Sequence, residues 1–272
     1  MSIPKFDDLP IKPGYPQHSA WGVWGDSDEL GTLNHLTKDR VLEARSEIQL
    51  GERITINWPM NLPSFPAFGR QAFEHRIISK HPRPVHDDVL HFNTQSGSQW
   101  DGLRHYGFKE HKLFYNGVTP EEIREGRSLR NGIHGKLMAE AGIAGRGVLL
   151  DYYAYVQRHK ITFDPLDTYA ISIDNLEACR REQGTEFKPG DILLIRVGYT
   201  DALGKNSHEE QKEVATRQPV RFAGVECKMD VIRWIWEKQF AAVAGDSPSW
   251  EVQPMGDWSL HEVSENYLSL VS

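Results

Sequence analysis

The side chains best placed to do chemistry lie in one run, QSGSQWDGLRH, at residues 95–105. Asp101 can supply a charged oxygen to a cation, and Gln95 and Gln99 can supply neutral carbonyl oxygens. His105 has an imidazole that titrates near neutral pH, so it can act as a general base or a general acid. The spacing alone does not separate this chemistry from a polar loop whose amides form ordinary hydrogen bonds.

Four further side chains could contact a substrate, and each has a structural alternative. Trp100 and Tyr106 flank the run and could stack on an aromatic substrate, although aromatic residues at such positions more often serve packing. Arg104 could bind a substrate carboxylate, or it could pair with Asp101. Asp246 follows an apolar run, where α/β folds place ligands, but an aspartate there also caps loops and helices.

Short apolar runs that alternate with amphipathic segments predict an α/β domain around this site. Residues 147–150 and 192–197 are apolar over their whole length, which is typical of buried strands, and a third strand is expected at 240–244. The residues just before it, 225–238, have apolar side chains at helical spacing, so we predict a helix that packs on the core.

Two N-capping signals predict helix starts. Thr37 precedes a helix whose Val41, Leu42 and Ala44 are expected to face inward. Thr119 begins a capping box with proline at the next position, which predicts a short helix from residue 120.

The stretch between these two helix starts is harder to interpret. Residues 53–58 alternate polar and apolar side chains, as a half-buried strand does. Residues 63–84 contain many prolines and predict a long loop, of the kind that often forms a lid or a binding loop.

We expect an N-terminal arm at residues 1–28, followed by one domain at residues 29–272. The arm contains Trp21 and Trp24, and its aromatic stretch is difficult to bury on a single domain. Because exposed apolar patches usually mark interfaces, we predict a homodimer or homotetramer to which the arm contributes.

The composition excludes several classes of protein. The net charge of −7 and the pI near 5.9 argue against nucleic acid or an anionic membrane as a partner, since both attract basic surfaces. The two cysteines, Cys179 and Cys227, do not have the spacing of a disulfide framework or a zinc site. No apolar run reaches the length of a membrane span, and the N-terminus lacks the pattern of a signal peptide. We therefore expect a cytoplasmic protein that acts on a small molecule.

The run at residues 95–105 resembles the metal-binding signature of the cyclase family of metal-dependent hydrolases, which includes bacterial kynurenine formamidases and isatin hydrolases. The family signature reads His-x-Gly-Thr-His-x-Asp, with a catalytic histidine four residues after the aspartate. In the same register this sequence has Gln95-x-Gly97-Ser98-Gln99-x-Asp101 and then His105. It is similar to a fungal and bacterial branch of the family whose signature reads Gln-Ser-Gly-Ser-Gln-Trp-Asp-Gly.

The resemblance extends from about residue 21 to residue 262. The segments that carry it, in the family's order, are WG at 24–25, GTLN at 31–34, GVLLD at 147–151, KPGDILLIRVGY at 188–199 and AVAGDSPS at 242–249. Several motifs in the right order identify the family more strongly than any one of them does.

The resemblance implies a swivelling β/β/α domain, with a mixed β-sheet core and flanking helices. It also implies the hydrolysis of a small amide, formamide, lactam or lactone by a water that a divalent ion activates. Asp101, Gln95, Gln99 and the distal His261 would surround the ion, and His105 would act as the general acid or base.

Two departures from the family pattern affect this interpretation. Both signature histidines are glutamines here, and amide oxygens favour Mn²⁺ or Mg²⁺ over Zn²⁺. We therefore expect one divalent ion and not a zinc pair, with Mn²⁺ or Mg²⁺ preferred and a single Zn²⁺ left open. The family also has a metal-binding glutamate roughly a dozen residues after the position of His261. Here the nearest match, Glu265-Asn266, comes too early, so we expect a shortened C-terminal part of the domain.

Two other functions remain open. A binding or scaffold protein could keep this fold without metal or turnover. A non-hydrolytic cyclase or dehydratase of secondary metabolism could use His105 and Asp101 for proton transfer alone.

Overall fold

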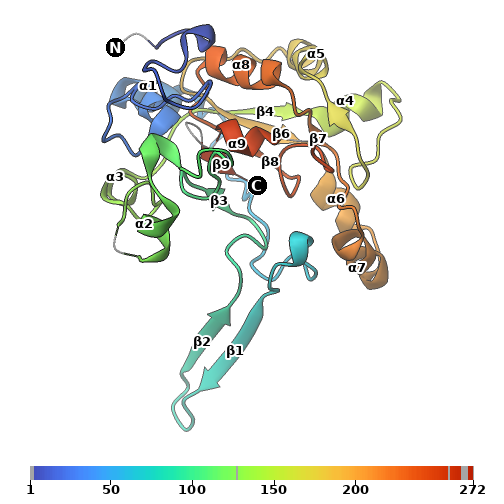
Figure 1. Ribbon diagram of the computed structural model, residues 1–272. Coiled ribbons are helices and arrows are strands. Elements are labelled where there is room, and N and C mark those ends of the chain that lie inside the picture. The colour runs from blue at the N-terminus through green and yellow to red at the C-terminus, as the bar shows by residue number, and fades with distance from the viewer. Residues whose placement is uncertain (1–2, 127, 257, 265–268, 272) are drawn as a thin grey trace.

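A five-stranded mixed sheet forms the centre of the protein (Figure 1) in a computed structural model that describes residues 3–126, 128–256, 258–264 and 269–271. The strands, in their order across the sheet, are β3 (Trp100–Asp101), β9 (Ser269–Val271), β8 (Ala242–Gly245), β6 (Ile192–Arg196) and β4 (Gly147–Asp151). The neighbouring pairs from β9 to β4 are parallel, whereas β3 runs antiparallel to β9 at the edge. The predicted α/β class with a mixed sheet and flanking helices is confirmed.

Strands β4 and β6 bury one face and leave the other partly open. Val148 and Leu150 of β4 pair with Leu193 and Ile195 of β6, and all four side chains are at most 3% exposed. Between them Leu149 points to the opposite face and is 47% exposed. The expectation of full burial is therefore wrong for β4 and β6, whereas Ala242, Val243 and Ala244 of β8 are at most 9% exposed. The open face is where a ligand can reach the sheet.

Helices cover the closed face of the sheet, as Figure 1 shows. They are α4 (Tyr152–Arg158), α5 (Ile173–Gln183) and α8 (Met229–Lys238). The apolar stripe of α8 buries Val231, Ile232 and Ile235 in the main core. This helix begins at Met229 and not at residue 225 as predicted. The reason is that Gly224–Val225 forms strand β7, which pairs in parallel with β5 (Ala170–Ile171).

The remaining helices are short and lie around the sheet. The α-helices are α1 (Lys38–Ala44), α2 (Pro120–Arg124), α3 (Lys136–Ala141), α6 (Tyr199–Gly204), α7 (His208–Thr216) and α9 (Leu260–Ser264). The 3-10 helices are η1 (Phe6–Asp8), η2 (Gly31–His35), η3 (Arg45–Glu47), η4 (Ala67–Gly69) and η5 (Tyr115–Gly117).

Both predicted N-caps are confirmed, but the inner face predicted for α1 is wrong. The Thr37 hydroxyl accepts a hydrogen bond from the backbone of Arg40, and Thr119 forms the complete capping box of α2. On α1, however, Val41 is 38% exposed and Leu42 is 60% exposed. The capping pattern fixes where a helix begins, but not which side meets the core.

A β-hairpin projects away from the sheet (Figure 1), where a loop was predicted. It consists of β1 (Glu74–Ser79) and β2 (His86–His91), which pair antiparallel, so only part of the predicted loop 63–84 is irregular. The strand predicted at 53–58 is also wrong, because these residues pair with no strand in the described chain. Alternation predicts a strand only where a partner strand is available.

The N-terminal arm packs on its own domain. Phe6, Trp21 and Val23 are at most 6% exposed and belong to the main core, and the Trp24 ring lies 5.9 Å from that of Trp236. The argument that these aromatic residues are hard to bury on one domain is therefore wrong. The homo-oligomer stays a prediction. None of the described helices has the length and hydropathy that crossing a bilayer requires.

Burial of His35 in η2 predicts a loss of stability in mild acid. The side chain is 4% exposed, and burial, helped by the charge of Arg40, lowers its pKa to about 4. Because the unfolded chain takes up this proton near pH 6.5, stability falls as the pH drops from 6.5 to 4, by up to about 3 kcal/mol. We expect His35→Gln to show a smaller difference than the parent, by about 2 kcal/mol, between urea unfolding at pH 7.5 and at pH 5. Equal losses in the two proteins would contradict this.

Candidate active site

The edge strand β3 presents Asp101, which is only 1% exposed. The chain reaches β3 through a tight loop that contains Gly97. A Cβ at Gly97 would come within 2.6 Å of the backbone oxygen of Leu62, so glycine is required for this approach. The Ser98 hydroxyl accepts a hydrogen bond of 2.7 Å from the Trp58 backbone N–H. These contacts hold the segment before the hairpin against the loop.

Both predicted glutamine ligands converge on the Asp101 carboxylate. The Nε2 atom of Gln95 donates a hydrogen bond to Oδ1. The Nε2 atom of Gln99 lies 3.4 Å from Oδ1 and 3.2 Å from Oδ2, so it donates to the same group. Oε1 of Gln95 is buried and has no hydrogen-bond partner among the described residues. The buried negative charge is thus met by two neutral amides.

This donor set fits one hard divalent cation and does not fit a zinc pair. Asp101 supplies a carboxylate, and the unpartnered Oε1 of Gln95 is an amide oxygen in need of a positive partner. The amide oxygen and nitrogen positions exchange on a half turn of the side chain, so Gln99 can present an oxygen as well. Within the described ranges, no three His, Cys, Asp or Glu side chains come close enough to hold a metal. Oxygen ligands of this kind suit Mg²⁺ or Mn²⁺.

His105 lies within the electrostatic reach of this group. It follows β3 after a turn in which its backbone N–H bonds to the carbonyl oxygen of Gly102. The ring keeps contact with solvent, but the protein atoms packed around it desolvate it and thereby lower its pKa. The charge of Asp101 opposes this shift, and the positive charges of His261 and Arg70 reinforce it. The imidazole is therefore neutral at pH 7 and able to accept a proton.

The distal histidine is held by a buried glutamate that the sequence did not indicate. Nδ1 of His261 lies 2.8 Å from Oε1 of Glu251, whose side chain is completely buried. Glu251 also accepts a hydrogen bond from the backbone N–H of Leu260. A glutamate was expected after His261, and the nearest match, Glu265-Asn266, lies outside the described residues. The carboxylate that contacts the His261 imidazole belongs instead to Glu251, ten residues earlier in the chain.

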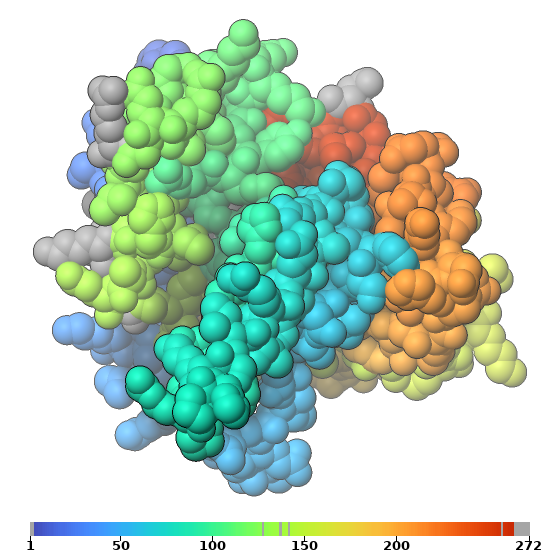
Figure 2. Space-filling model, turned by 90° about the horizontal axis from the view of Figure 1, so that it is seen from below, coloured from blue at the N-terminus to red at the C-terminus, as the bar shows by residue number. Residues whose placement is uncertain are grey.

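A cavity of about 490 Å³ lies beside this group, against the open face of the sheet. Gln95, Gln99 and Arg70 line it, so the cavity and the Asp101 group share a wall. Residues 55–58, 63 and 67, in the segment before the hairpin, also line the cavity. Figure 2 shows that segment beside α6 and α7, and Phe65 contacts the ring of His208 there.

Three of the predicted substrate contacts lie away from this cavity. Trp100, Arg104 and Tyr106 are not among the residues that line it, and of the other predicted site residues Asp101, His105 and His261 do not line it either. The Nη1 atom of Arg104 lies 3.5 Å from the carbonyl oxygen of Ser128, and the Tyr106 ring lies 6.0 Å from that of His261. Among the described ion pairs Arg104 does not pair with Asp101 either, so neither interpretation of this arginine matches its contacts.

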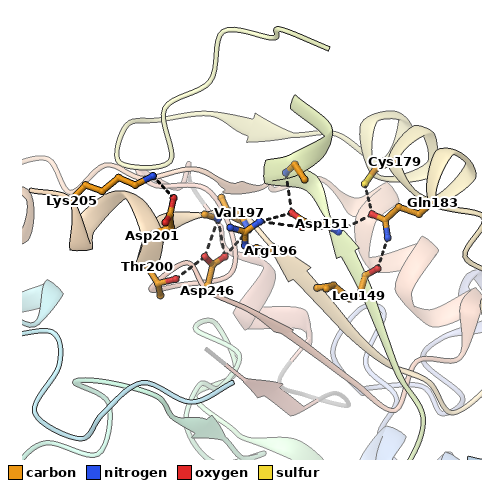
Figure 3. Close-up of polar contacts among 12 residues, drawn as sticks. Leu149, Asp151, Cys179, Gln183, Arg196, Val197, Thr200, Asp201, Lys205 and Asp246 are labelled. Atoms are coloured by element: carbon orange, nitrogen blue, oxygen red, sulfur yellow. Dashed lines mark hydrogen bonds and ion pairs between the residues drawn. The ribbon is translucent and has the colours of Figure 1, made fainter. Parts of the chain in front are cut away.

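Asp246 does line the cavity, at the end of β8 (Figure 3). Its carboxylate accepts hydrogen bonds from the backbone N–H groups of Val197 and Gly198 and from the Thr200 hydroxyl, at 2.6 to 3.3 Å. Burial raises the pKa of this carboxyl, and the two backbone bonds oppose the increase. These bonds join β8 to the turn after β6 and shape the cavity floor.

The chain belongs to the putative cyclase family, whose model matches residues 28–252. Among solved structures it is similar to a novel cyclase, with 26% identity and a TM-score of 0.80 over 93% of this chain and 85% of the other. It is also similar to isatin hydrolase A from Ralstonia solanacearum, with 14% identity and a TM-score of 0.54 over 87% and 84% of the two chains. Isatin hydrolase A from Labrenzia aggregata, bound to benzyl benzoate, gives 13% identity and a TM-score of 0.55 over 85% and 84%. Comparison with curated proteins gives no significant match.

The Glu251–His261 contact gives a testable stability effect. We expect Glu251→Ala to lower the free energy of unfolding by about 1–3 kcal/mol, because it leaves the Leu260 N–H without its acceptor. Glu251→Gln keeps an acceptor oxygen and should cost less. Urea unfolding at pH 7.5 measures both. If both variants were as stable as the parent, Glu251 would not hold this part of the site.

Proposed function

We propose that this chain is a hydrolase of a small amide, formamide, lactam or lactone. The observation that carries the proposal is the buried Asp101 carboxylate, on which two amide side chains converge beside His105 and a cavity of about 490 Å³. The chain's membership of the putative cyclase family agrees with it. Two of the similar structures are hydrolases by name.

Asp101, Gln95 and Gln99 would hold one divalent cation, Mg²⁺ or Mn²⁺, with His261 as a further ligand. When bound, such an ion polarises a carbonyl and lowers the pKa of a water. Asp101 contributes the formal negative charge of this group, so it would dominate the affinity for a cation. Glu251 holds the Nδ1 side of His261, so a cation would be met by the other ring nitrogen, Nε2.

His105 serves as the proton carrier. Its neutral imidazole takes the proton from the attacking water as the water oxygen bonds to the substrate carbonyl carbon. The bond from that carbon to the leaving nitrogen or oxygen then breaks, and the imidazolium returns the proton to the leaving group. Because its pKa lies below the usual value, His105 is in the basic form at neutral pH before the first step.

A non-catalytic binding protein is a second candidate, favoured by one observation. Both glutamines already donate N–H groups to Asp101, so the carboxylate is satisfied without a cation. Metal analysis of the purified chain separates the two candidates, because a stoichiometric divalent ion supports the hydrolase and its absence after supplementation supports the binding protein.

Asp101 and His105 should be separable by mutation. We expect Asp101→Asn to lose metal and activity together, because it removes the one formal charge that the motif offers to the ion. His105→Ala should retain the metal while turnover falls by roughly 10²–10⁴-fold. Metal content, measured beside the hydrolysis rate on an amide or lactone that the parent cleaves, tests both. In the parent, activity should fall in acid with an apparent pKa below 6.5, as the lowered pKa of His105 requires.

Two outcomes would contradict this assignment. If His105→Ala loses the metal as readily as Asp101→Asn, His105 is a ligand and not the proton carrier. If neither variant changes rate or metal content, the motif is not the active site. Arg104→Ala is a useful control, because Arg104 lies in the same motif but forms no described ion pair with Asp101, and its Nη1 atom lies 3.5 Å from the carbonyl oxygen of Ser128.

Metal preference should follow the two glutamines. We expect the parent to bind Mn²⁺ or Mg²⁺, and the double variant Gln95→His, Gln99→His to bind Zn²⁺ more tightly, since imidazole suits zinc better than an amide oxygen does. Calorimetric titration with each metal gives the affinities. Unchanged zinc affinity in the double variant would mean that these side chains do not face the ion.

A further inference from the structure

Arg70 lies at the junction of the cavity and the Asp101 group. It follows η4, lines the cavity, and donates a hydrogen bond of 2.6 Å from Nη1 to the backbone oxygen of Gln95. Its guanidinium also lies 4.9 Å from the centre of the Phe68 ring. These contacts fix the head group and use one of its five N–H donors.

No carboxylate forms an ion pair with Arg70 in the described parts of the chain. Asp101 acts on it only at longer range, and burial lowers the pKa of the guanidinium. A half-buried cation without a close anion is costly, and the protein supplies only a carbonyl oxygen and an aromatic ring. Among the described residues, the guanidinium therefore has no anionic partner on its cavity side.

The other charged side chains that line the cavity already have close partners. Nη1 of Arg196 lies 3.0 and 3.1 Å from the two carboxylate oxygens of Asp151, as Figure 3 shows. The Asp246 carboxylate accepts hydrogen bonds from the backbone N–H groups of Val197 and Gly198, just after β6. Among the described charged side chains that line the cavity, Arg70 is therefore the one to which a ligand could supply an ion-pair partner.

The rest of the cavity wall is largely apolar. Ile56, Trp58, Leu149 and Leu194 line it, and a volume of about 490 Å³ suits a small molecule with an aromatic or similar body. A single planar guanidinium matches a carboxylate through two parallel hydrogen bonds. Asp246 lines the same cavity and opposes a second negative charge, which favours a carboxylate over a phosphate dianion.

We propose that the cavity binds a small, mainly apolar carboxylic acid and that Arg70 holds its carboxylate. The substrate of the hydrolase would then be an amide or lactone that also carries a free carboxylate. This reading of the substrate rests on the proposed function, whereas the binding of an acid does not.

Binding of benzoate and its uncharged isostere benzamide tests the proposal without turnover. Calorimetry on the full chain, with no metal added, should give at least about tenfold tighter binding of benzoate. Arg70→Gln should abolish this preference and leave benzamide binding unchanged. The matched control is Arg196→Gln, which makes the same change at a guanidinium of the same cavity that is already paired, and it should keep the preference.

Several results would overturn the proposal. They are equal binding of the two probes by the parent, a preference that survives in Arg70→Gln, and a preference lost in Arg196→Gln instead. If Arg70→Gln does not fold, as judged by circular dichroism, Arg70→Lys decides the question. It keeps the charge without the planar fork, so the preference should weaken several-fold, and an unchanged preference would contradict the proposal.

The two proposals can fail separately. If Arg70→Gln loses the preference for benzoate, the acid-binding proposal is supported whether or not the protein is a hydrolase. A hydrolase that depends on His105 but binds benzoate and benzamide alike would keep the proposed function and remove the acid site.

Discussion

The site depends on how the protein compensates one buried negative charge. Asp101 is almost inaccessible to solvent, and a buried carboxylate is costly unless it is paired or hydrogen-bonded. No described cation lies close enough to form an ion pair with it. The two amides of Gln95 and Gln99 provide hydrogen bonds but no net charge. The group therefore stays electrostatically attractive to a cation, and Arg70 and His105 respond to it at longer range.

The same constraint explains why the polar motif and the cavity belong together. The alternation of β4 and β6 places Val148 and Leu193 in the core and Leu149 on the open face, which forms the cavity floor. Another part of the cavity wall is the irregular segment before the hairpin. Two hydrogen bonds join this segment to the motif, from Trp58 to Ser98 and from Arg70 to Gln95. Residues that surround Asp101 thus also anchor the wall that a substrate would touch.

Local signals predicted the elements well, and long-range contacts were not predictable. The capping box at Thr119 and the apolar runs of β4, β6 and β8 act over a few residues, so the sequence contains what decides them. The alternation at 53–58 failed because a strand needs a partner that the pattern does not specify. Arg70 and Glu251 were missed for a related reason, since neither lies in a motif. Their roles come from contacts with Gln95 and His261, which only the folded chain brings near.

Glutamine in place of histidine changes the electrostatics of the motif more than its shape. A histidine ligand bound to a metal has its second ring nitrogen fixed by another partner, so it has one functional orientation. A glutamine amide has a donor end and an acceptor end, and rotation exchanges them. With the N–H groups toward Asp101, as here, the carboxylate is satisfied and Oε1 of Gln95 is left without a partner. With the oxygens turned inward, the same side chains and Asp101 together face a cation. In the first arrangement one buried oxygen lacks a hydrogen-bond donor, which is costly, and a cation that accepts oxygen ligands would relieve this cost by stabilising the second arrangement.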